Sequence, residues 1–201
     1  MIFKIALSLV GVLVFIFIMW KRLREDYGDT TVFTSSFYII FGILAGVLFS
    51  LYFNHEWWFW SGLAGSFVGY AASIIKFKLR AFEVLEPNVL GIMVLLGLVF
   101  IYDYIERGDL PSAAGFFVLV LLFVLFAVLN RHYKNFSWYK SGRIGFSGLA
   151  ILGLFFLIRA AVAVFSFNVI SFVGKGPEVI LSGVLAFGSF LLLFNISEVK
   201  S

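Results

Sequence analysis

Few residues in this chain have side chains that could do chemistry, and one of them lies inside an apolar run. Arg159 is past the middle of residues 144–165. A guanidinium keeps its charge at any ordinary pH, and a charged side chain near the bilayer centre costs about 2.5–3.5 kcal/mol on insertion scales. Arg159 must therefore face water, a lipid headgroup or an acidic partner. The candidate neighbours are Asp103, His55 and Glu178, which lie at the ends of other apolar runs.

Two interpretations of Arg159 remain open at this point. In the structural one, it pairs with Asp103 or extends its guanidinium toward lipid phosphates. In the functional one, its planar fork of five donors binds a lipid phosphate bidentately. Charges inside a membrane usually mark functional sites, and this supports the second interpretation.

The elements that must position Arg159 are long apolar segments. The chain has 201 residues, 62% of them hydrophobic, and its mean hydropathy is +1.07. Runs of about 20 apolar residues are typical of transmembrane helices. We therefore predict an all-α, polytopic integral membrane protein in which residues 1–201 form one domain. Its seven expected transmembrane helices cover residues 2–20, 32–53, 57–75, 89–103, 111–130, 144–165 and 178–196.

Basic residues orient these segments. Eleven lysines and arginines fall in the loops and tail on one side of the predicted membrane, and three fall on the other. Because basic loops stay in the cytoplasm, the N-terminus is expected outside and the C-terminus inside. Arg159 then lies near the outer end of its helix, on the same side as His55, Asp103, Arg107 and Glu178. These residues could line one outer-facing cavity.

Several classes of site are excluded or disfavoured by composition. The absence of cysteine excludes disulfides and thiolate catalysis, and two histidines argue against a metal site. No cofactor motif is present, and the net charge of +4 is assigned to orienting loops rather than to nucleic acid.

Local patterns predict three further features. Small residues four apart predict close helix packing; they are Gly42, Gly46 and Ser50 in one run, and Gly62, Gly65, Ser66 and Gly69 in the next. Residues 81–88 are interpreted as a short surface segment. Residues 166–177 are too broken to span, so they either lie in the membrane interface or fold back into the protein as a lid or re-entrant segment.

The order of these elements resembles the prolipoprotein diacylglyceryl transferase family. Residues 59–87 are similar to the family's glycine-containing helix, basic turn and short segment before a proline, and residues 152–159 are similar to its last arginine motif. The resemblance implies a multi-pass protein of the bacterial inner (cytoplasmic) membrane. It also implies transfer of diacylglyceryl from phosphatidylglycerol to the cysteine of a lipoprotein precursor, recognised through its signal peptide.

The resemblance also assigns candidate residues. Arg159, Arg107 and Trp60 would bind the lipid phosphate, and His55 or Asp103 would accept the thiol proton. The chain departs from the family at other positions: Trp60 stands where a histidine precedes the glycine pair, and Ala163 stands where a glutamate follows the last arginine. Residues 101–108 also replace the family's signature loop.

Two hypotheses follow for the activity. The protein is either a divergent transferase that handles an anionic phospholipid, or a non-catalytic relative that binds phospholipid or presents a helix scaffold. An unrelated transporter is disfavoured because the chain shows no internal repeat.

Overall fold

The computed structural model describes residues 2–133, 145–165 and 168–198. Within these ranges the protein is all-helical, and every secondary-structure element is a helix. The elements are α1 (Ile2–Leu23), α2 (Asp29–Phe53), the 3₁₀ helix η1 (His55–Trp57), α3 (Trp58–Phe77), α4 (Ala81–Arg107), α5 (Leu110–His132), α6 (Phe146–Phe165) and α7 (Lys175–Glu198).

Six of the described helices are long and apolar enough to cross a membrane: α1, α2, α4, α5, α6 and α7. This agrees with the expected class of helical membrane protein. The other α-helix, α3, has 20 residues and is not among these six.

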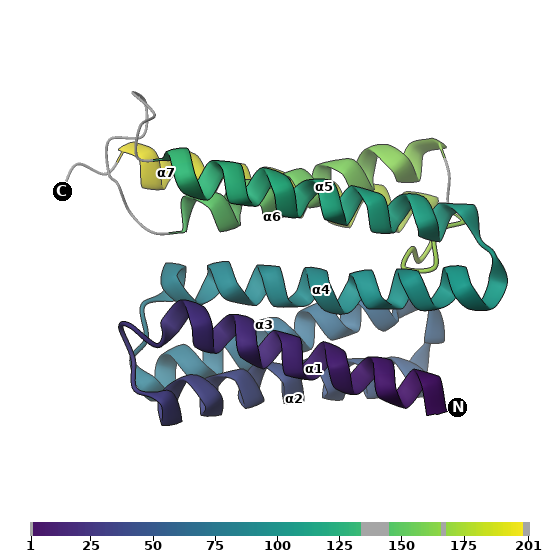
Figure 1. Cartoon of the computed structure of the whole chain (residues 1–201). Helices are drawn as coiled ribbons and strands as arrows, with labels where there is room; N and C mark the ends of the chain where they lie inside the picture. Colours follow the sequence, from purple (N-terminus) through teal and green to yellow (C-terminus); the bar gives the residue numbers. More distant parts are fainter. Residues whose placement is uncertain (1, 134–144, 166–167, 199–201) are drawn as a thin grey trace.

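The long helices run roughly parallel or antiparallel to one another, in two groups (Figure 1). In the view of Figure 1, α1, α2 and α3 lie below α4, and α5, α6 and α7 lie above it. The largest apolar cluster contains α4 residues such as Met93 and Leu96 together with α6 residues such as Ile151 and Phe156. The fourth helix therefore forms the centre of the bundle.

The start of α4 corrects one expectation from the sequence. Residues 81–88 were predicted to form a surface segment, but they are the first two turns of α4. Val84, Glu86, Pro87 and Asn88 are buried. Glu86 pairs with Arg22 of α1 at 3.2 Å, so an acidic residue that suggested a surface position is accommodated inside by an ion pair.

The small residues of α2 and α3 meet as their spacing predicted. A Cβ atom added to Gly42 would lie 2.2 Å from the carbonyl oxygen of Gly65, and one added to Gly46 would lie 2.0 Å from that of Ser61. The two backbones are therefore in direct contact. Gly69 lies equally close to Tyr38, so α3 runs back along α2 in the antiparallel direction.

The connection between α6 and α7 differs in part from its prediction. Residues 175–177 belong to α7, with Pro177 in its first turn, where the missing N–H has no helical partner to lose. Residues 168–174 form a loop whose Ser171 is fully buried and whose Val169, Ile170 and Val173 pack on the main core. This part folds back into the protein. Residues 166–167, much of the basic loop at 131–143 and Lys200 lie outside the described residues.

Candidate functional site

Arg159 is buried in the interior of the bundle, with 5% of its surface exposed. Its guanidinium carbon lies 3.8 Å from the centre of the Phe59 ring and 4.8 Å from that of Phe172. The rings of Trp60 and Phe155 lie 5.8 and 5.6 Å away. Aromatic faces attract a cation within about 6 Å of their centres. Together these rings enclose the charge.

Glu178 of α7 provides the opposite charge. Its Oε1 atom accepts hydrogen bonds from Arg159 Nε at 2.9 Å and from Nη2 at 2.6 Å. The buried loop before α7 provides two more acceptors: Arg159 Nη1 donates to Ser171 Oγ at 2.8 Å, and Nη2 donates to the Ser171 carbonyl at 3.0 Å. Four of the five guanidinium N–H groups therefore have a partner.

Two further donors complete the environment of the Glu178 carboxylate, which is fully buried. Ser182 Oγ, one turn further along α7, donates to Oε1 at 2.9 Å, and Trp60 Nε1 donates to Oε2 at 3.0 Å. A buried ion pair is tolerated when such bonds satisfy both charges. We call Arg159, Glu178, Trp60, Ser171 and Ser182 the buried network. It joins α3, α6, α7 and the loop before α7, and its paired charges cancel.

Of the residues predicted for a site, the structure brings Arg159 and Trp60 together, through Glu178. Asp103 of α4 is buried, but it accepts a hydrogen bond from Ser112 Oγ at 2.6 Å and pairs with Arg107 Nε at 3.3 Å. Arg107 is 68% exposed at the end of α4, and His55 is exposed in η1. Among the described residues, the acidic partner of Arg159 is Glu178.

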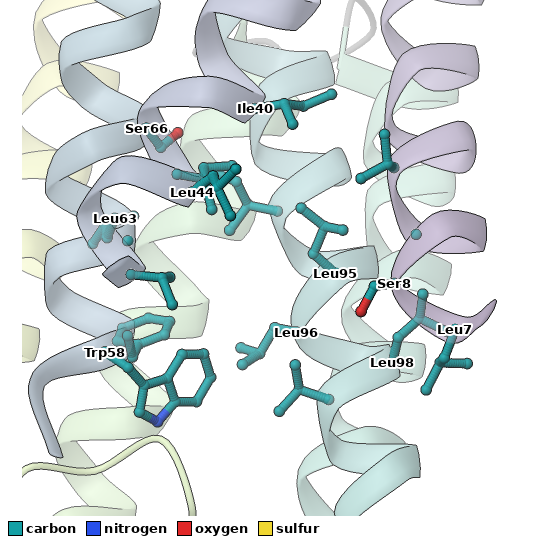
Figure 2. Close-up of a pocket in the computed structure, with 18 of the residues that line it drawn as sticks. Leu7, Ser8, Ile40, Leu44, Trp58, Leu63, Ser66, Leu95, Leu96 and Leu98 are labelled. Carbon is teal, nitrogen blue, oxygen red and sulfur yellow. The ribbon is translucent and has the colours of Figure 1, made fainter. Parts of the chain in front are cut away.

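A cavity of about 550 Å³ lies between two pairs of helices, α1 with α4 and α2 with α3. Figure 2 shows Leu7 of α1 and Leu98 of α4 on one side, Leu44 of α2 on the other, and Trp58 of α3 at one end. The lining is mostly apolar, with aliphatic side chains and the aromatic rings of Trp58, Phe59 and Tyr102. We call this space the lateral cavity. Its size and apolar lining are those of a small-molecule or lipid-chain site, which typically has a volume of about 300–1,000 Å³.

The lateral cavity reaches the surface between α1 and α2. Lys4 and Ser8 of α1 and Leu44 of α2 line it and are also exposed. The same surface carries large exposed side chains such as Phe41 and Leu48, which are 72% and 52% exposed. An apolar surface of this extent is expected to face lipid. The opening is therefore directed sideways, toward the hydrocarbon layer.

The lateral cavity and the buried network share a wall. Phe59 lines the cavity, and its ring is the one closest to Arg159. The neighbouring Trp58 also lines the cavity, and its indole N–H donates to the Ile170 carbonyl in the loop before α7 at 3.1 Å. The first residues of α3 thus line the cavity on one side and contact the buried network and the loop before α7 on the other.

Sequence reasoning missed Ser171, Ser182 and the lateral cavity. Ser182 could have been found, because it follows Glu178 by four residues and so shares its helix face. No local sequence pattern predicts the cavity, because its size depends on the distance between two pairs of helices.

Comparisons of the chain with protein-family models, with curated proteins and with solved structures found no match.

Proposed function

We propose that this protein binds a membrane phospholipid and holds one of its acyl chains in the lateral cavity. The observation that carries the proposal is a cavity of about 550 Å³ with a mostly apolar lining and an opening between α1 and α2. An acyl chain can enter through such an opening without crossing water. Burial of its methylene groups in a membrane protein is stabilised by close packing rather than by release of water.

Polar groups at one end of the cavity support a lipid with a headgroup rather than a simple hydrocarbon. Lys4 lies at that end, in the first turn of α1, with the Tyr102 hydroxyl group and ring beside it. The ammonium group of Lys4 can bind a phosphate. The remaining lining of the cavity has few polar atoms.

The geometry favours the non-catalytic hypothesis over the transferase. Transfer of diacylglyceryl needs a free cation for the leaving phosphate and a base at the same place. Glu178 neutralises Arg159 and Ser171 occupies two of its donors. Asp103 is already paired with Arg107. The transferase remains an alternative that rests on the order of motifs, with Arg159 on the phosphate and His55 or Asp103 as the base.

We further propose that α3 crosses the membrane with the six longer helices, which gives seven spans. The backbone of α3 contacts that of α2 along much of its length: Gly69 lies against Tyr38, and Ser61 lies against Gly46. This long contact supports the assignment. With seven spans, the distribution of basic residues favours an outer N-terminus and a cytoplasmic C-terminus. The resemblance supports the bacterial inner membrane as the location.

The test of lipid binding is a variant that fills the lateral cavity. Leu95 of α4 lines it (Figure 2), so Leu95→Trp should place an indole where the chain lies. The matched control is Leu121→Trp on α5, where Leu121 is 67% exposed on the outer face of the bundle. Native mass spectrometry of protein extracted in mild detergent should show retained phospholipid in the wild type and in Leu121→Trp. It should show several-fold less in Leu95→Trp. Equal retention in all three proteins would contradict the proposal.

A second assay separates the two hypotheses about activity. Reconstituted protein is incubated with phosphatidylglycerol and a peptide that contains a lipoprotein cysteine. We expect no thioether product. Formation of that product would establish the transferase and replace the non-catalytic hypothesis.

A further inference from the structure

The polar end of the lateral cavity carries charges of both signs. Lys4 Nζ lies 3.8 Å from Glu106 Oε2 and 4.8 Å from the centre of the Tyr102 ring. Glu106 follows Tyr102 by four residues in α4, so the two side chains share one face of that helix, Tyr102 in the cavity and Glu106 one turn closer to the helix end.

This ion pair is loose, and both members can accept a ligand. Its 3.8 Å separation is longer than a hydrogen bond between nitrogen and oxygen. The side chains are 58% and 48% exposed, and exposed pairs of this kind contribute little to stability. The Tyr102 side chain interacts with both residues. Because each is about half exposed, Lys4 keeps further donors available and Glu106 keeps further acceptor capacity available.

The pair lies at the level where lipid headgroups are expected. Lys4 is the second residue of its apolar span, which begins at Phe3, and Glu106 is the last but one of its span, which ends at Arg107. A lipid whose chain occupies the cavity would thus place its phosphate and its terminal group next to these two side chains.

We propose that the lateral cavity selects a zwitterionic phospholipid with a primary amine, that is, a phosphoethanolamine headgroup. This inference rests on the proposed function and adds the headgroup class. The phosphate accepts hydrogen bonds from Lys4, whose own ammonium lies over the Tyr102 ring, and the ammonium of the lipid donates to Glu106.

Glu106 supports that choice over an anionic lipid. Glu178 neutralises the buried Arg159 at 2.6 Å, and Asp103 offsets the charge of the exposed Arg107 at 3.3 Å. A purely anionic headgroup would be repelled by Glu106 and would compete with it for Lys4. A zwitterionic headgroup satisfies both residues.

The experiment measures which lipid the protein retains from an equimolar mixture. Phosphatidylethanolamine, phosphatidylcholine and phosphatidylglycerol with identical chains are offered to the delipidated protein, and bound lipid is counted by native mass spectrometry. We expect phosphatidylethanolamine to be favoured over each of the others by about fivefold, as a partly exposed charge pair allows. Glu106→Gln should remove the preference, and Lys4→Gln should weaken retention of all three lipids.

Matched controls are Glu56→Gln and Lys175→Gln, which change the same charges at exposed positions of η1 and α7. Both should retain the wild-type preference. Equal retention of the three lipids, a preference for phosphatidylglycerol, or a preference unchanged by Glu106→Gln would overturn the headgroup assignment. In those cases a loss of lipid in Leu95→Trp would leave the proposed function intact. If the wild type retains none of the lipids, both the proposed function and this inference fail.

Discussion

Removal of either charge from the buried network should destabilise the fold at least as much as removal of both. In Glu178→Gln the buried guanidinium loses its counter-charge, and the single amide oxygen replaces only one of the two carboxylate oxygens, of which Oε1 accepts from Ser182 and Oε2 from Trp60. Breaking a buried ion pair typically costs about 3–5 kcal/mol. Since the unfolded state in a micelle also finds polar partners, we expect the lower end of this range, about 3 kcal/mol.

The double variant makes the prediction specific. Arg159→Met alone should also cost about 3 kcal/mol, because it leaves the Glu178 carboxylate buried without its cation. If the two residues act mainly on each other, Arg159→Met combined with Glu178→Gln should cost no more than either single change. The coupling energy would then be at least about 3 kcal/mol, at the upper end of the range measured for residues in contact.

The measurement is reversible unfolding in mixed micelles, with increasing SDS and tryptophan fluorescence as the signal. The control is Arg80→Gln, because Arg80 forms an equally short pair with Glu83 at 2.9 Å but is 79% exposed. Its unfolding midpoint should stay close to that of the wild type. If the costs of Arg159→Met and Glu178→Gln simply add in the double variant, the reasoning about a self-contained buried pair is wrong.

Two further predictions concern the fold. Gly65→Ala should lower the thermal stability measured in detergent, because its Cβ would lie 2.0 Å from the Gly42 carbonyl oxygen. The control Gly183→Ala on α7 should not, because the added atom meets nothing within 4 Å. Equal effects would mean that the α2–α3 backbone contact is not close. A reporter fused to the C-terminus should be found in the cytoplasm if α3 completes seven spans with an outer N-terminus, and a reporter outside the cell membrane would reject that topology.

The sequence predicted features that depend on local spacing. The prediction that the small residues of α2 and α3 allow close packing was correct, because residues four apart share a helix face in any environment. The apolar runs predicted the six long helices for a similar reason: length and hydropathy are properties of one segment. In both cases no knowledge of the neighbouring helices was needed.

Features that depend on a distant partner were predicted less well. Glu86 and Pro87 suggested a surface segment, because nothing near them in the chain shows that Arg22 lies 3.2 Å from Glu86. Arg159 was expected to face water, a lipid headgroup or an acidic partner, and Asp103, His55 and Glu178 all remained as candidate neighbours. The choice of Glu178 depends on the direct packing of α6 against α7 and on the way the loop between them folds inward, and neither can be read from hydropathy.

The buried network has a structural consequence for the lateral cavity. Interiors of proteins are close-packed, so an apolar space between helices tends to collapse unless its walls are held apart. At one end of the helix group, the wall is held by Trp58, whose indole binds the Ile170 carbonyl, and by Phe59, whose ring lies against Arg159.

At the other end of the same helices, Tyr27 holds the walls in place. Its hydroxyl donates to Glu83 at 2.7 Å and accepts from the Arg80 backbone N–H at 3.0 Å. These bonds join the turn between α1 and α2 to the turn between α3 and α4. Tyr27 thus ties the two helix pairs together beyond one end of the cavity, and at the other end Trp58 and Phe59 fix α3 against α6 and the loop before α7. Arg159 thus fixes the position of α3 and would support the proposed lipid site from outside it, since the groups proposed to contact the lipid are those of the cavity and its polar end.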